Sequence, residues 1–83
     1  MRYYFHTENG EVVHDAEGLE LADDVAARRE GVSFFAEMLR DRAEVFWMEG
    51  RFRVTIIDEA GRPVGEVTAD GAGQPHLDPR ERS

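Results

Sequence analysis

One stretch of the chain, residues 24–47, has the apolar periodicity of an amphipathic helix, and the segments on either side of it alternate as β-strands do. A helix of this length has to bury an apolar face, and the flanking strands are the partners that so short a chain offers it. The order of elements therefore predicts an α+β fold made of a β-hairpin, one long helix and a second β-hairpin. We expect an antiparallel sheet of about four strands with the helix across one face.

The first hairpin is predicted by alternation in residues 2–7 followed by Asn9-Gly10, a strong signal for a tight turn. A two-residue loop would set Glu8 directly opposite Glu11, which is unfavourable for two like charges. A three-residue loop avoids this pairing, and we expect it to set Phe5 opposite Val13.

The second hairpin is predicted over residues 51–68. Phe52, Val54 and Ile56 alternate with their neighbours in the first of its strands and would face inward. Pro63 and Gly65 weaken the returning strand, so we place that strand at an edge of the sheet.

The helix is predicted to begin at Asp23 or Asp24, either of which is a good N-cap, and to end near Phe46 or Trp47, before Gly50. Gly31 lies inside it, and a close approach of the backbone to another element would explain a glycine there.

Two apolar stripes run along this helix. The stripe that we expect to face the sheet is about 100° wide and consists of Val25, Val32, Phe35, Ala36, Leu39, Ala43 and Phe46. The second stripe consists of Ala27, Phe34, Met38 and Val45. Either the core face is wide and the remaining apolar residues are ordinary exposed ones, or the second stripe is a subunit interface that uses Phe34 and Met38.

Composition changes near Thr68. Residues 69–83 contain two glycines, two prolines and Leu77 as the only sizeable apolar residue. We therefore expect a single domain over residues 1–68 and a flexible C-terminal tail over residues 69–83. A domain of roughly 68 residues buries only about 60% of the surface that its unfolded chain exposes, and association with another copy is a common remedy.

A set of short motifs runs along residues 2–68. They are Arg2-Tyr3-Tyr4-Phe5-His6, Gly10, Asp15-x-x-Gly18-x-Glu20-Leu21, Ala26 and Arg29 in the helix, and Phe52-x-Val54-x-Ile56-x-Asp58-x-x-Gly61 in the second hairpin. Through these motifs the chain resembles a family of short uncharacterised bacterial proteins, mainly from alphaproteobacteria, that carry a domain of unknown function. The resemblance implies one domain over residues 2–68, and it implies no activity, cofactor or catalytic residue.

Few residues are suited to catalysis or metal binding. His6 and His14 are weak candidates for metal ligands, because Asp15 would point to the opposite face of the hairpin from His14. The chain has no cysteine, which excludes a thiol nucleophile and a cysteine-bound metal. No nucleophile motif and no glycine-rich phosphate loop occurs. We therefore expect no enzyme activity and no cofactor.

The charge balance is acidic, with 18 Asp and Glu against 10 basic residues, all of them arginine, and a net charge of -8. This balance argues against nucleic acid as a partner. The first residues contain no secretory signal, and no apolar run approaches the roughly 18 residues that span a bilayer. We therefore expect a soluble cytoplasmic protein that does not contact a membrane.

Together these features predict a small self-associating interaction module that acts by binding, with another copy of itself as its partner. Its interface would use Phe34, Met38 and Val45 of the helix, or Tyr4 and Ile57 on the outer face of the sheet. The alternative is a regulatory module that binds an unknown protein or a nucleic acid, and a metal-binding protein is a weaker alternative.

Overall fold

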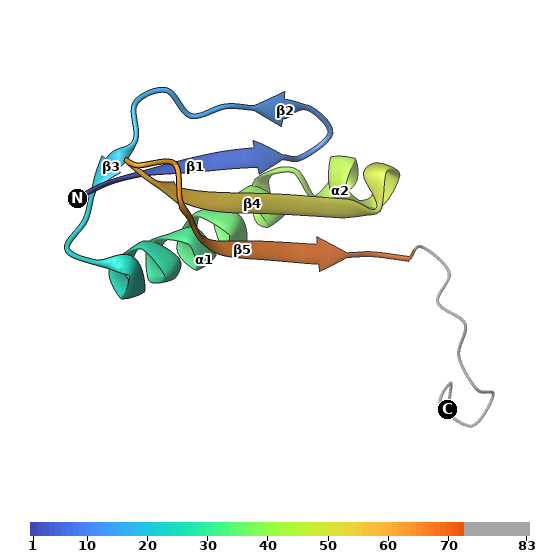
Figure 1. Ribbon diagram of the computed structural model, residues 1–83. Coiled ribbons are helices and arrows are strands. Elements are labelled where there is room, and N and C mark those ends of the chain that lie inside the picture. The colour runs from blue at the N-terminus through green and yellow to red at the C-terminus, as the bar shows by residue number, and fades with distance from the viewer. Residues whose placement is uncertain (73–83) are drawn as a thin grey trace.

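The structure is a computed structural model that describes residues 1–72 of the chain. Within these residues the chain forms five strands and two helices (Figure 1): β1 (Arg2–Glu8), β2 (Val12–Val13), β3 (Leu19–Glu20), α1 (Asp24–Asp41), α2 (Ala43–Glu49), β4 (Arg51–Asp58) and β5 (Pro63–Asp70). The strands pair antiparallel in the order β2-β1-β4-β5, and β3 also pairs with β1. Figure 1 shows both helices on one face of this sheet. The predicted α+β class is confirmed.

The first hairpin closes through a loop of three residues. Thr7 lies opposite Val13 and Glu8 lies opposite Val12, which leaves residues 9–11 in the loop. Gly10 has φ 98°, a conformation that glycine adopts without a steric penalty. The expected pairing of Phe5 with Val13 is therefore wrong by two residues. Because the error is an even number of residues, the strand faces are as predicted.

The core lies between the helices and the sheet face that they cover. The buried apolar side chains are Tyr3, Ala27, Phe35, Met38, Phe46, Phe52, Val54, Ile56 and Val64. Phe52, Val54 and Ile56 are each 0% exposed, as the alternation in β4 predicts. These three side chains form the floor on which α1 and α2 pack.

The helical region is interrupted once. Asp23 is the N-cap of α1, and its carboxylate accepts the N–H of Ala26 at 2.8 Å, in line with the sequence-based expectation. The predicted single helix is divided at Arg42, whose backbone has φ -122° and ψ 36°, and the guanidinium of this residue donates to the carbonyl oxygen of Asn9 at 3.1 Å. Gly50, in the left-handed conformation, ends α2.

β5 lies at the edge of the sheet, as Pro63 and Gly65 predict, and extends to Asp70. The predicted domain boundary at Thr68 therefore falls inside β5. Most of the predicted tail, residues 73–83, lies outside the described residues. Neither α1 nor α2 has the length and apolar character that a bilayer-spanning helix needs.

Candidate functional site

Helix α1 packs on the sheet through residues of both predicted stripes, because Ala27 and Met38 of the second stripe and Phe35 of the first are all buried. Ala27 and Met38 are 0% and 7% exposed, whereas Val25 and Val32 are each 58% exposed. Gly31 explains why this face of α1 packs on the sheet, because a β-carbon at that position would overlap the Cδ1 atom of the Ile56 side chain. The assignment of Val25 and Val32 to the core is therefore wrong. The small residues Ala27 and Gly31 were the sequence signal that marks the closely packed face.

The apolar stripe left outside the core runs along one side of α1. It consists of Val25, Val32, Ala36 and Leu39, of which Leu39 is half-buried at the margin of the core. Val25, Val32 and Leu39 are seven residues apart, so their side chains lie in one line along the helix. We call these four residues the outer stripe.

The outer stripe lies on the side of α1 that is next to the edge strand. Arg28, one turn from Val25 and from Val32, donates from Nε to the carbonyl oxygen of Val64 in β5 at 2.8 Å. On its other side β5 pairs with β4, and no described strand pairs with its free edge. The outer stripe and the free edge of β5 therefore form one continuous region, which we call the α1/β5 surface.

A groove lies on the opposite flank of α1, where the helix leaves part of β1 and its neighbours uncovered. It has a volume of about 320 Å³ and is lined by Phe5, Thr7, Val13, Asp15, Leu19, Glu30 and Phe34. The rings of Phe5 and Phe34 meet edge to face across it, with centroids 6.4 Å apart. The groove is thus apolar at its base and carries two carboxylates.

Asp15 fixes the chain segment that forms one wall of the groove. Its carboxylate oxygens accept the backbone N–H groups of Gly18, Phe5 and Glu17 at 3.1, 3.1 and 3.0 Å. Burial alone would raise the pKa of Asp15, but these three donors outweigh it and lower the pKa. An aspartate three residues before a glycine in a turn is the sequence signal for this arrangement.

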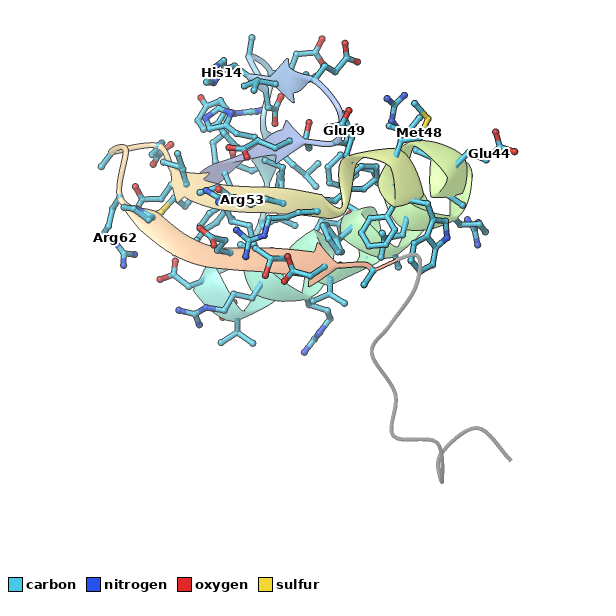
Figure 2. The ribbon with its side chains drawn as sticks, turned by 90° about the vertical axis from the view of Figure 1, so that its right-hand side faces the viewer. His14, Glu44, Met48, Glu49, Arg53 and Arg62 are labelled. Atoms are coloured by element: carbon cyan, nitrogen blue, oxygen red, sulfur yellow. The ribbon has the colours of Figure 1, made fainter. Side chains whose placement is uncertain are left out.

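The two candidate metal ligands contact each other. The rings of His6 and His14 pack edge to face with centroids 5.1 Å apart, and His14 lies at the β2 edge of the sheet (Figure 2). Nδ1 of His6 accepts the backbone N–H of Asp15 at 3.0 Å, which leaves one ring nitrogen for other partners. No group of three or more His, Asp or Glu side chains within residues 1–72 has the arrangement of a metal site.

A second polar network lies at the end of the sheet where β1 and α1 begin. The hydroxyl of Tyr3 donates to Asp24 at 2.7 Å, and Arg62 donates to Asp24 at 2.8 Å and to Asp58 at 3.0 Å. The hydrogen bond to Asp24, together with burial, raises the pKa of Tyr3 to about 12. Arg62 lies in the β4–β5 turn (Figure 2), so this network ties the turn to the start of α1 and to β1. The polar side chains of this network form hydrogen bonds and ion pairs with one another.

The predicted interface residues lie in three different places. Met38 is in the core, so it offers almost no surface to a partner, and Val45 is half-buried against the core beneath Gly10. Phe34 is 38% exposed in the wall of the groove. Tyr4 and Ile57 pair across β1 and β4 on the outer sheet face, where both are half-buried.

Arginines on the sheet are paired with acidic side chains. Arg53 lies 3.9 Å from Glu8 on the neighbouring strand, and Arg51 lies 2.7 Å from Asp70. Figure 2 shows Arg53 on β4, and its neighbours Phe52 and Val54 point into the core on the other side of the strand. The charge of these arginines is therefore partly neutralised.

Comparison with known families gives one match, to a family described as a domain of unknown function, DUF6894, and the match covers residues 2–70. The chain belongs to this family. No curated protein and no solved structure gives a significant match. In this DUF6894 domain the α1/β5 surface and the groove lie on opposite flanks of one helix, so the two regions are separate.

Proposed function

We propose that this DUF6894 domain is a self-associating interaction module that acts by binding and not by catalysis. One observation supports the proposal above all others: the apolar outer stripe of α1 lies exposed beside the unpaired edge of β5. An exposed apolar line along a helix and an open strand edge are both features that natural proteins usually cover. A second copy of the chain covers both at once.

The occupant that fits this surface is a second copy related by a two-fold axis. In such an arrangement β5 pairs with β5 of the second copy and α1 lies antiparallel to its counterpart, so that the two sheets become one. An axis close to Val32 places Val25 next to Leu39 of the second copy. Apolar residues then meet apolar residues along the whole contact.

Charge complementarity supports the antiparallel arrangement. Asp23 stands at the N-terminal end of α1 and Arg40 in its last turn. Within residues 1–72, Arg40 has only its neighbour Asp41 as an ion-pair partner, at 3.8 Å, and both side chains are more than 70% exposed. When two copies run antiparallel, Arg40 of each approaches the acidic helix start of the other.

The proposal replaces the interface first expected at Phe34, Met38 and Val45. The reasoning behind that expectation was that two apolar stripes need two packing partners. With Met38 and Ala27 buried by the sheet, the stripe that still needs a partner is the one through Val32. An interface through Tyr4 and Ile57 is less favoured, since both are already half-buried within their own sheet.

Sedimentation velocity on the full chain, across about 1 to 100 μM, tests the proposal. We expect a dimer for the wild type and a monomer for Val32→Asp. Ser33→Asp is the matched control, because it places the same side chain one residue away on an exposed position of the same helix. A wild type that remains monomeric throughout, or a Val32→Asp variant as dimeric as Ser33→Asp, would contradict the proposal.

Nucleic acid is the less favoured partner. The sheet arginines Arg51 and Arg53 already face Asp70 and Glu8, and the chain as a whole has a net charge of -8. A phosphate backbone would have to displace these acids and overcome a repulsive field. We expect no retention of single- or double-stranded DNA or RNA by micromolar protein in filter binding at low salt.

A further inference from the structure

The groove on the other flank of α1 is built from fixed elements. Its base is the inner face of β1, β2 and β3, and its wall is α1, which the core holds against β4. Four of its lining residues are large and apolar: Phe5, Val13, Leu19 and Phe34. Val13, Leu19 and Phe34 are 44%, 43% and 38% exposed, so the groove is apolar and open to a partner.

The two carboxylates of the groove, Asp15 and Glu30, differ in whether they are free to bind a partner. Both oxygens of Asp15 already accept backbone N–H groups. The carboxylate of Glu30 forms no ion pair or hydrogen bond with any residue in the described range 1–72. Among residues 1–72, no arginine or other cation lines the groove. A partner therefore meets an apolar pocket in which the Glu30 carboxylate is the charged group left free by the described residues.

We propose that this groove binds a peptide segment of another protein, in which a large apolar side chain stands next to a lysine or arginine. The apolar side chain packs in the groove against Phe5, Val13 and Phe34. The cation of the peptide pairs with Glu30. The volume of about 320 Å³ lies at the lower end of the range for ligand pockets and suits one bulky side chain with its flanking backbone.

A second copy of the chain is a poorer occupant of the groove. A two-fold contact between two grooves would bring Glu30 of one copy near Glu30 of the other, and Glu37 is exposed about two turns further along the same side of α1. Like charges brought together across an interface cost affinity. The inference stands independently of the proposed self-association, because the α1/β5 surface lies on the other flank of the helix.

The probes for a direct test are three fluorescein-labelled peptides of nine residues. The first has a central phenylalanine flanked by lysines, the second replaces the lysines by glutamates, and the third replaces the phenylalanine by alanine. Fluorescence anisotropy with the full chain gives each affinity. We expect the first peptide to bind with a dissociation constant on the order of 100 μM, and the other two to bind at least about tenfold more weakly.

Variants and amide shifts locate the binding. Glu30→Gln should weaken binding of the first peptide about threefold to tenfold, because it removes the charge and keeps the side chain's shape. Glu44→Gln changes an exposed acid on α2 (Figure 2) that does not line the groove, so it is the matched control and should leave the affinity unchanged. In ¹⁵N-resolved NMR the peptide should shift the amides of Phe5, Val13 and Phe34.

Three results would overturn the inference. One is equal binding of the lysine and glutamate peptides, and another is an affinity that Glu30→Gln does not change. The third is a set of shifted amides that lies outside the groove. Val32→Asp should bind the first peptide as the wild type does, so a failure of the peptide test is distinguishable from a failure of self-association.

Discussion

Gly31 of α1 lies so close to Ile56 of β4 that a β-carbon on residue 31 would overlap the Cδ1 atom of the isoleucine. Ile56 is 0% exposed, so any shift of its side chain would have to be accommodated inside the core. This contact fixes the distance between helix and sheet and the rotation of α1 about its own axis. It thereby determines that Val25 and Val32 lie outside the core.

Gly31→Ala is expected to destabilise the domain although alanine favours helix formation. The added methyl group overpacks the core at a cost of about 1 to 3 kcal/mol, against a gain in helix propensity of about 1 kcal/mol. Urea unfolding followed by circular dichroism measures the free energy of unfolding.

The double variant Gly31→Ala/Ile56→Val supplies the control. Valine lacks the Cδ1 atom that the new methyl group would meet, and Ile56→Val alone costs about 0.5 to 1.5 kcal/mol. In the valine background, Gly31→Ala should be neutral or stabilising. If alanine costs the same free energy in both backgrounds, the contact does not set the helix position.

Asp15→Ala is expected to loosen the segment between β2 and β3. The substitution removes the acceptor for three backbone N–H groups, and loss of such a cap costs about 1 kcal/mol. Hydrogen exchange should become faster at the amides of Phe5 and Gly18. Glu17→Ala in the same turn is the control, and comparable loss of protection in both variants would refute the assigned role.

Local signals in the sequence predict much of the fold. Asn9-Gly10 predicts the first turn, the alternation of Phe52, Val54 and Ile56 predicts the buried face of β4, and Asp23 predicts the start of α1. Each of these signals depends on neighbours within a few residues. They are the parts of the prediction that the structure confirms.

Two of the parts that failed depend on contacts between distant residues. The break at Arg42 accompanies a hydrogen bond to Asn9, 33 positions away. The rotation of α1 depends on the contact of Gly31 with Ile56. Because both stripes of α1 are apolar, the helix pattern alone does not distinguish them. The exposed surface proposed for self-association therefore could not be assigned correctly before the helix was placed on the sheet.

Acid should weaken the fold through Asp24 and Asp58. Side-chain hydrogen bonds from Arg62 and Tyr3 lower the pKa of Asp24, and the pKa of Asp58 is lowered mainly by the backbone N–H of Arg62. Each of these carboxyls has a lower pKa in the folded state than the value of 3.8 that it has in the unfolded state. Its contribution to stability is therefore complete above pH 3.8 and is lost as the pH falls through the pKa of the folded state.

Thermal unfolding at pH values from about 7 down to about 2 measures this effect. We expect the melting temperature to fall most steeply below pH 3.8. Asp58→Asn should flatten that part of the curve, because its amide does not titrate. A steep fall that Asp58→Asn leaves unaltered would assign the acid sensitivity to other groups.

Alkaline pH should act through Tyr3. Its hydrogen bond to Asp24 and its burial raise the pKa of Tyr3 to about 12 from 10.0. A raised pKa means that the contribution of Tyr3 to stability is complete below pH 10 and is lost as the pH rises through 12. The difference in absorbance near 295 nm between the wild type and Tyr3→Phe follows ionisation of this phenol. A midpoint at 10.0 would mean that the network with Asp24 and Arg62 does not form.

The proposed antiparallel contact of two α1 helices should depend on salt. Arg40 would meet the acidic start of the opposite helix at an exposed site, where an ion pair contributes at most about 1 kcal/mol and is screened by salt. Arg40→Gln should therefore raise the dissociation constant of the dimer about threefold at low salt and abolish most of its salt dependence. Glu44→Gln, which also removes one charge, should have no such effect. Sedimentation equilibrium at about 0.05 and 0.5 M KCl provides the measurement. A dimer that Arg40→Gln stabilises would instead indicate that the two helices run parallel, with the arginines of both copies at the same end.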